Sequence, residues 1–152
     1  MYRHLQNQIN KPVNAQLTIK EDMKRGTFVK TAFDTTDKVS KIEKATTIAE
    51  VEGILVRDVV VDVDVAMGLP ISDYSETQDL VKAKEYAGVE PIYKGERLAT
   101  DQYGTLTDTE AQEGKYLTVT AGKLEKSADA TTIVSLGWIM DAGHKLLGFK
   151  FI

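Results

Sequence analysis

The feature that most constrains the fold of this chain is an internal repeat of β-type sequence. In the first half, residues 26–30 contain a glycine followed by an apolar pair, and a turn comes next. After the turn come Lys-Ile-Glu-Lys at residues 41–44, Ala-Thr-Thr-Ile at 45–48 and an apolar segment that begins with a glycine at 53–56. The same pieces return in the same order between residues 114 and 141, with a shorter first turn. Because several pieces match in order, we interpret them as two copies of one β unit. Repeated hairpin units predict a small β sandwich or barrel.

A third, partial copy lies between these two. Residues 94–99 read Lys-Gly-Glu-Arg-Leu-Ala, with a basic residue and a glycine ahead of an apolar residue. Residues 25–28, Arg-Gly-Thr-Phe, have the same arrangement. We interpret residues 94–99 as part of the same repeated motif.

The local patterns also favour strands joined by turns. Short segments alternate polar and apolar residues and are separated by Gly, Asp or Asn. The clearest strand prediction is residues 59–65, where four valines share one face and Asp62 and Asp64 share the other. A hairpin is predicted with its turn at residues 34–37, between strands 28–30 and 39–42. Further strands are predicted at residues 53–56, 92–93, 97–99, 105–107, 116–119, 123–124, 132–134, 136–140 and 146–152.

Only residues 75–87 favour a helix. Ser75 is a candidate N-cap, Gln78 completes a capping-box pattern, and Gly88 ends the segment. Residues 80–86 also fit a strand, so both interpretations stay open. The predicted fold is therefore mainly β, a small β-barrel or sandwich built from repeated hairpin units with at most one or two short helices.

These patterns divide the 152-residue chain into four segments. Residues 1–16 are expected to form an extended N-terminal arm, either a frayed end or a tail that orders on a neighbouring subunit. Residues 17–70 form the first β unit, residues 71–90 a connecting segment, and residues 91–152 a second β unit sharing one core with the first. The C-terminus ends on alternating apolar residues, which predicts a strand docked on this chain or on a partner.

Composition narrows the function. The chain contains no cysteine, which excludes disulfides, thiolate catalysis and zinc–thiolate sites. Its 19 basic and 23 acidic residues are mixed along the sequence, so we expect no nucleic-acid partner. No apolar run is long enough to span a bilayer and no signal-peptide pattern occurs, so we expect no membrane partner and synthesis in the cytoplasm.

Candidate catalytic and metal-binding residues are few. The only histidines are His4 and His144, and no nucleophile elbow or phosphate-binding glycine motif accompanies them. Asp62 and Asp64 project from one face of a predicted strand, about 7 Å apart, and with Asp58 they are candidate ligands for Ca²⁺. The alternative is a solvated polar face opposite lysines. We therefore predict no enzymatic activity, no cofactor and no metal, with Asp62 and Asp64 as weak metal candidates.

The aromatic residues allow two interpretations. Trp138 lies in an apolar segment, so we expect it in the core. The tyrosines at residues 86, 93, 103 and 116 lie near turns and strand starts, where they form either an interface or ordinary surface cover.

Four segments resemble capsid decoration (auxiliary head) proteins of tailed bacteriophages. They are Arg-Gly-Thr-Phe-Val at residues 25–29, Glu-Gly-Ile-Leu-Val at 52–56, Lys-Gly-Glu-Arg-Leu at 94–98 and Asp-Gln-Tyr-Gly-Thr-Leu at 101–106. The resemblance implies a virion protein on the outer face of the capsid, often trimeric, that binds the major capsid protein and bridges neighbouring subunits. Glu96 stands where the family often has aspartate, and the 59–65 segment has no counterpart that we can place.

The leading hypothesis is therefore a virion structural protein that binds the major capsid protein and forms a homo-oligomer, a trimer or a dimer. Alternatives are a carbohydrate- or cell-surface-binding β module, with Asp62 and Asp64 at its site, and, last, a small hydrolase built on His144. The expected interface residues are Tyr2, Arg3, His4 and Leu5 in the arm and Phe149, Phe151 and Ile152 at the C-terminus.

Overall fold

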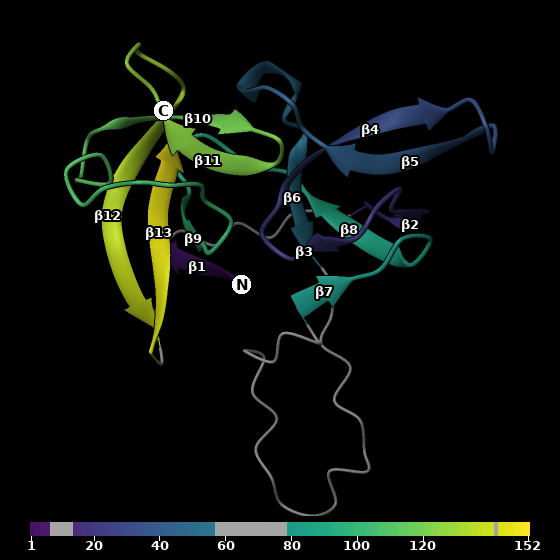
Figure 1. Cartoon of the computed structure of the whole chain (residues 1–152), viewed down its shortest axis with the longest axis horizontal. Helices are drawn as coiled ribbons and strands as arrows, with labels where there is room; N and C mark the ends of the chain where they lie inside the picture. Colours follow the sequence, from purple (N-terminus) through teal and green to yellow (C-terminus); the bar gives the residue numbers. More distant parts are fainter. Residues whose placement is uncertain (7–13, 57–78, 142) are drawn as a thin grey trace, which may run out of the picture.

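The computed structural model describes residues 1–6, 14–56, 79–141 and 143–152, and confirms a mainly β fold (Figure 1). Helical structure in this part of the chain is limited to η1 (Ile48–Glu50), a 3₁₀ turn, and to Asp79. The strands are β1 (Tyr2–Gln6), β2 (Asn14–Thr18), β3 (Met23–Lys24), β4 (Phe28–Asp34), β5 (Val39–Lys44), β6 (Gly53–Val56), β7 (Leu80–Val81), β8 (Tyr86–Glu90), β9 (Arg97–Thr100), β10 (Tyr116–Thr120), β11 (Lys123–Lys126), β12 (Ile133–Asp141) and β13 (His144–Phe151).

The strands form two main curled sheets that lie side by side (Figure 1). One sheet has the order β2-β8-β6-β4-β5, and the other has the order β1-β9-β13-β12-β10-β11. A separate two-stranded sheet pairs β3 with β7. We call β2, β4, β5, β6 and β8 the first unit, and β9, β10, β11, β12 and β13 the second unit.

The two units share one topology. If the five strands of each unit are numbered in chain order, both sheets run third, second, fourth, fifth, first. In both units, a parallel bridge links the segment after the first strand to the third strand, at Ile19–Ile42 and at Tyr103–Leu124. The sequence repeat therefore corresponds to a repeat of structure, and the bridges show that both sheets curl in the same way.

Matching hydrogen bonds fix which residues of the two units correspond. Three backbone hydrogen bonds of the first unit recur in the second, all at 2.8–3.0 Å. In the first unit, the N–H groups of Gly26, Leu55 and Ala45 donate to the carbonyls of Leu55, Thr27 and Phe28, respectively. In the second unit, the N–H groups of Gly114, Ser135 and Ser127 donate to the carbonyls of Ser135, Lys115 and Tyr116, respectively. Gly26 and Gly114 also have the same left-handed backbone, with φ of 86° and 84°. Phe28 thus corresponds to Tyr116, and Ala45 to Ser127.

The partial copy at residues 94–99 forms the same turn. Gly95 has φ of 90°, and Glu96 N–H donates to Tyr93 O at 3.2 Å, just as Thr27 N–H donates to Lys24 O. Only glycine adopts this conformation without steric cost. A fourth copy, not apparent from the sequence, precedes β8, where Lys84 takes the glycine position with φ of 71°. The motif therefore marks the start of a strand.

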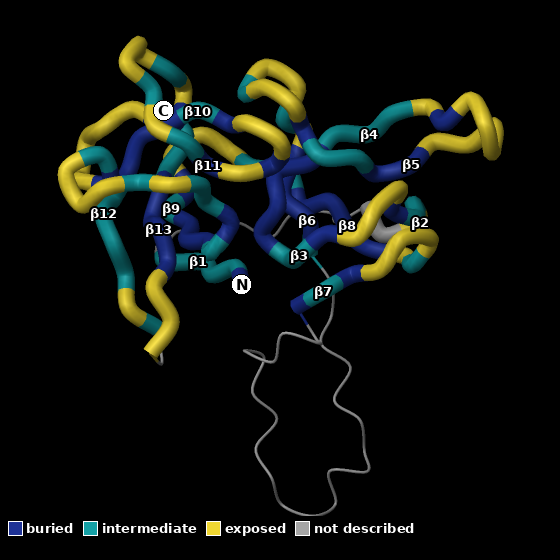
Figure 2. The backbone as a smooth tube through the Cα atoms, in the orientation of Figure 1, coloured by how far each residue is buried: buried dark blue, intermediate teal, exposed yellow. Residues whose placement is uncertain are grey.

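Buried side chains form two large clusters and one small cluster. Figure 2 shows that buried residues occur along strands of both units. The first unit encloses its own cluster, which includes Val29, Ile42 and Leu55. The largest cluster lies in the second unit but also takes in Phe28 and Ile54 from the first. Because successive side chains of a strand point to opposite faces, β4 sends Val29 into one cluster and Phe28 into the other. The two units are thus joined by shared apolar packing.

Parts of the sequence prediction need correction. Within the predicted 75–87 helix, Asp79 is helical, whereas residues 80–87 form β7, a turn and the start of β8. Of the two interpretations of residues 80–86, the strand is therefore correct for β7, because Leu80 and Val81 pair with β3 and Val81 is fully buried. Ser75 and Gln78 lie outside the described residues. Residues 92–93 and 105–107, predicted as strands, lie in turns and loops. The 59–65 segment also lies outside the described residues. In the part of the chain that is described, no helix is long and apolar enough to cross a membrane.

Candidate binding surfaces

The predicted arm residues lie within this chain's own fold. Tyr2, Arg3 and His4 belong to β1, which pairs with β9 at the edge of the second unit. The Arg3 guanidinium lies 2.8 Å from Asp141, near the end of the β12–β13 hairpin. Their partners therefore include this chain itself, and Leu5 packs beside the small apolar cluster.

β1 also contacts the first unit. His4 Nε2 lies 3.0 Å from Glu90 Oε1, and the Tyr2 hydroxyl donates to the same oxygen at 3.3 Å. Burial, and then the charge of Glu90, raise the pKa of Tyr2, so its phenol stays protonated and serves as a donor. Glu90 belongs to β8 of the first unit, so β1 holds the two units together.

The α-amino group of Met1 lies in a cluster of charges at the junction of the units. It is 2.7 Å from Asp79 Oδ2 and 2.5 Å from Asp101 Oδ1, and Arg25 Nε is 3.1 Å from the other oxygen of Asp79. Asp79 and the Met1 side chain are almost fully buried. A buried charge is tolerated only when it is paired, so these groups depend on each other.

The C-terminal residues also pack within the chain. Phe149 is fully buried, and its ring lies 5.3 Å from that of Phe28 across the junction of the units. Phe151 is half-buried against the same cluster, while Ile152 is 45% exposed. Of the two alternatives for this strand, the structure places it on its own chain, between β12 and β9.

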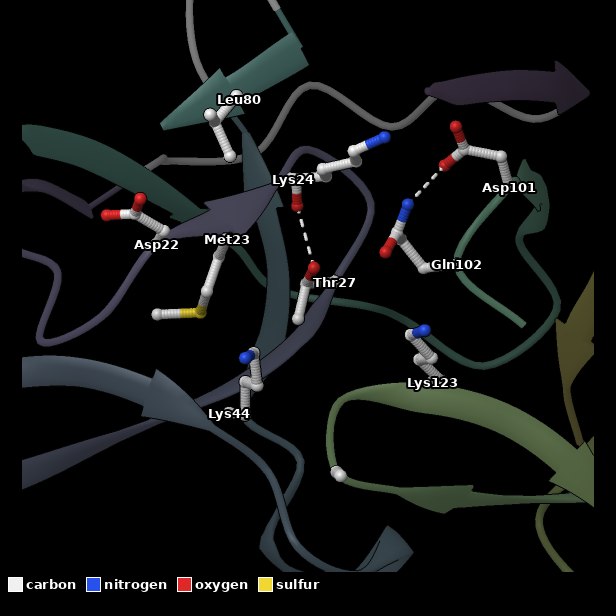
Figure 3. A pocket seen from close by; sticks show the side chains of 10 residues that line it. Asp22, Met23, Lys24, Thr27, Lys44, Leu80, Asp101, Gln102 and Lys123 are labelled. Atoms are coloured by element: carbon white, nitrogen blue, oxygen red, sulfur yellow. Dashed lines mark hydrogen bonds between the residues drawn. The ribbon is translucent and has the colours of Figure 1, made fainter. Parts of the chain in front are cut away.

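A hollow of about 430 Å³ lies between the units (Figure 3). Its charged side chains come from both sides: Asp22 and Lys24 at β3 and Lys44 of the first unit on one side, and Asp101 and Lys123 of the second unit on the other. The carboxylates already have partners, since Asp22 accepts the Ala83 N–H at 2.8 Å and Asp101 lies beside the Met1 amine. The hollow is a polar junction of mixed charge, and its lysines give it the capacity to attract an anion.

Large exposed apolar side chains occur at the ends of two hairpins. Phe33 and Val39, 63% and 47% exposed, flank the end of the β4–β5 hairpin, and Met140, 66% exposed, lies near the end of β12–β13. Both hairpins extend away from the body of the protein (Figure 1). Scattered apolar residues need no explanation, but their position on projecting hairpins makes these ends candidate contact sites.

Ion pairs stiffen the end of the β4–β5 hairpin. Lys41 donates to Asp34 at 3.0 Å and also to Asp37, across the turn that joins the strands. The Lys41 hydrogen bond, with help from the Thr36 N–H, lowers the pKa of Asp34 to about 2. The hairpin end is therefore held in one shape before any partner binds.

Trp138 is only partly in the core. Its ring packs against the largest cluster and lies 5.0 Å from Tyr103. Its indole N–H reaches the surface and donates to Asp108 at 2.9 Å, and the Lys145 ammonium lies 4.0 Å from its ring. The expectation that Trp138 lies in the core is therefore correct only for the face of its ring that packs against the cluster.

The candidate metal and catalytic residues are not brought together in the described structure. Asp58, Asp62 and Asp64 lie outside the described residues. Among those that are described, no three His, Asp or Glu side chains are placed to hold a metal ion. His144 is exposed at the first position of β13.

Sequence reasoning missed one contact between the units. The turn between β10 and β11 lies against the first unit, where Gly122 N–H donates to Ala45 O at 2.8 Å and Phe28 N–H donates to Gly122 O at 2.9 Å. A signal was present in the aligned repeats, where apolar Phe28 and Ala45 correspond to more polar Tyr116 and Ser127.

Comparison with models of protein families, with curated proteins and with solved structures finds no match.

Proposed function

We propose that this chain is a virion structural protein that binds the outer surface of a phage capsid and stabilises the lattice by bridging subunits. The observation that supports this most is the projecting β12–β13 hairpin, which is held near its end by the Arg3–Asp141 ion pair and carries an exposed apolar side chain. The resemblance of residues 25–29, 52–56, 94–98 and 101–106 to decoration proteins points the same way.

The β12–β13 hairpin is built to reach a neighbouring surface. Its pairing runs from Ile133–Phe151 in the core to Asp141–His144 at the end. Met140 is exposed there, and the Arg3–Asp141 ion pair holds the hairpin against β1. An apolar residue surrounded by polar ones is the usual composition of a protein–protein contact. The arm residue Arg3 thus acts by positioning the hairpin.

The partner in this proposal is the major capsid protein. A single small contact of this kind is weak, because ordering and lost translational freedom offset much of the binding energy. Many copies on a regular lattice, joined to one another, would bind far more tightly than one copy alone. The protein therefore acts through repeated, additive contacts.

The test is co-sedimentation of the purified protein with tailed-phage capsid shells that lack accessory proteins. We expect saturable binding at a fixed copy number per shell. Met140→Asp should weaken binding at least about tenfold, which is the loss expected when one of the few contact residues that carry most of the binding energy is changed. Tyr86→Asp is the matched control, since Tyr86 is 68% exposed but lies on the first unit, and it should bind normally.

Two results would contradict the proposal. One is the absence of saturable binding to shells; the other is an equal loss in both variants, which would show that the hairpin end is not the contact. Binding to glycans in place of shells would support the carbohydrate- or cell-surface-binding alternative.

A further inference from the structure

The contact between the two units uses a hairpin end and a notch. The turn at residues 121–122, at the end of the β10–β11 hairpin, fills a notch between the start of β4 and the residue after β5. The fit is close, because a Cβ at Gly122 would lie 2.6 Å from Thr27 Cγ2 and 3.2 Å from Lys44 Cγ. Phe28 and Ala45, which form the notch, are fully buried.

The second unit has the same notch, and there it is open. Tyr116 and Ser127 stand in the positions of Phe28 and Ala45, with the same 3.0 Å hydrogen bond between them. A hollow of about 560 Å³ lies beside them, with Lys115, Lys126 and Ala128 also in its lining. Tyr116 is 38% exposed. Tyrosine and serine suit a surface that is hydrated in the free protein and buried in a complex, because their hydroxyl groups can hydrogen-bond in both states.

The first unit has the matching hairpin end, and it is also unoccupied. The β4–β5 hairpin corresponds to β10–β11, and its end carries exposed Phe33 and Val39. Figure 1 shows β10–β11 pointing toward the first unit and β4–β5 pointing away from the second. One end of the molecule thus presents a free hairpin end, and the second unit presents a free notch.

We propose that copies of this chain associate head to tail, with the β4–β5 hairpin end of one copy seated in the Tyr116 notch of the next. The contact inside the chain is the model for this association. Its notch, which lies on the first unit, recurs on the second unit, and its hairpin end, which lies on the second unit, recurs on the first. This inference does not rest on the proposed capsid function.

The chemistry of the two surfaces is complementary. Phe33 brings an aromatic ring to a notch that contains Tyr116 and the exposed methyl of Ala128. The turn carries the carboxylate of Asp37, which accepts from Lys41 but stays half-exposed, and Lys115 at the notch has no ion pair with a described residue. The turn at residues 35–38 is longer than the turn at 121–122, and the hollow provides the extra room.

Contacts of this kind join two different surfaces, so a dimer keeps one free notch on one copy and one free hairpin end on the other. Such heterologous assembly closes into a ring if the rotation between copies allows it, and otherwise continues as a filament. The oligomer therefore grows with protein concentration until a ring closes.

The direct test is cross-linking between single-cysteine variants, which is clean because the chain has no cysteine of its own. Thr36→Cys and Ala128→Cys are purified separately, mixed, and treated with a short bismaleimide. We expect a cross-linked dimer of the two different variants well above the yield from either variant alone. Met140→Cys mixed with Ala128→Cys is the control and should give only background.

The second test is sedimentation velocity from about 1 μM to about 1 mM, which covers weak self-association. The average mass should rise with protein concentration. In Phe33→Asp the same rise should require a protein concentration at least about tenfold higher. Tyr86→Asp, of similar exposure, and Met140→Asp should leave it unchanged. A loss of shell binding in Met140→Asp with normal self-association would separate this contact from the proposed capsid contact.

The inference is overturned if the protein stays monomeric over this whole range and the Thr36–Ala128 cross-link does not exceed the control. It is also overturned if Thr36→Cys cross-links mainly to itself, since that pattern indicates a symmetric contact between two hairpin ends.

Discussion

The first and second units share five strands in the same order, yet they differ at the loops and at the notch. The second unit joins β12 to β13 by a tight turn, whereas residues 57–85 lie between β6 and β8 of the first. The hydrogen bonds around Gly26 and Gly114 are nevertheless the same. The strand framework is thus fixed by backbone geometry, while the connections between strands differ in length, as connecting segments commonly do.

The notch shows how a neighbour changes the chemistry of one position. Phe28 is fully buried because the β10–β11 turn covers it, and its counterpart Tyr116 is 38% exposed because nothing in the described structure covers it. Equivalent backbone positions therefore carry an apolar residue in one unit and an amphipathic residue in the other. The difference comes from the second unit's position beside the first.

The largest expected effect comes from truncating these two aromatic residues. Phe28→Ala should reduce the free energy of unfolding by about 3–5 kcal/mol, since it leaves a cavity in the shared cluster. Tyr116→Ala should cost about 1 kcal/mol or less, because the ring is partly exposed. Chemical denaturation of both variants measures the difference. Equal losses would show that the two positions are not the covered and open forms of one site.

The next effect concerns the charges that join the units. Asp79→Ala leaves the Arg25 guanidinium and the Met1 amine without their buried carboxylate, and we expect a loss of about 2–4 kcal/mol. Glu21→Gln is the control, since its ion pair with Lys44 lies at the surface and contributes about 1 kcal/mol at most. Thermal or urea unfolding distinguishes them. A negligible loss in Asp79→Ala would mean that this charge cluster does not contribute to joining the units.

A smaller effect separates the two equivalent glycines. Gly26→Ala and Gly114→Ala both place a side chain in the left-handed region, at about 1 kcal/mol each. Gly26→Ala should lose about 1–2 kcal/mol more, because its Cβ would lie 2.4 Å from Thr100 Oγ1 whereas Gly114 faces open space. Urea midpoints of the two variants give the comparison. A greater loss at Gly114 would contradict the described packing.

The smallest effect is a pH dependence at two carboxylates that accept hydrogen bonds from lysines, although they do not occupy equivalent positions of the two units. Hydrogen bonds from Lys41 and Lys126 are the largest causes that lower the pKa of Asp34 and of Glu110 to about 2. Because these pKa values lie below those of the unfolded chain, about 4, the stabilisation is complete above about pH 4 and is lost as pH falls through about 2.

The matching variants are Lys41→Met and Lys126→Met. Each should raise the pKa of its own carboxyl partner only partway to the usual range, because the backbone N–H groups of Thr36 and Thr107 still donate. NMR titration of the carboxyl carbons measures this shift. An unchanged titration of Asp34 in Lys41→Met would show that the ion pair does not form in solution.

Some of the fold could be predicted from particular residues. Lys-Ile-Glu-Lys at 41–44 and Lys-Leu-Glu-Lys at 123–126 place β5 and β11 correctly, because alternating side chains and β-branched residues are local signals. Residues 80–86 fitted both a helix and a strand, because the capping pattern at Ser75 and Gln78 is a local signal whereas the pairing of β7 with β3 is not. The arm looked free for the same reason, since its partners β9 and Glu90 are distant in sequence.

The sequence by itself determined that this protein is made of β units, that the unit occurs twice, and that Gly26, Gly95 and Gly114 begin strands. These features depend on backbone conformation and on side-chain alternation over a few residues, which neighbouring residues fix. Only the tertiary structure decided that Met1 pairs with Asp79, that β1 joins the second sheet, and that the notch is covered at Phe28 and open at Tyr116. Those outcomes depend on contacts between residues far apart in the chain, which form only when the two units pack together.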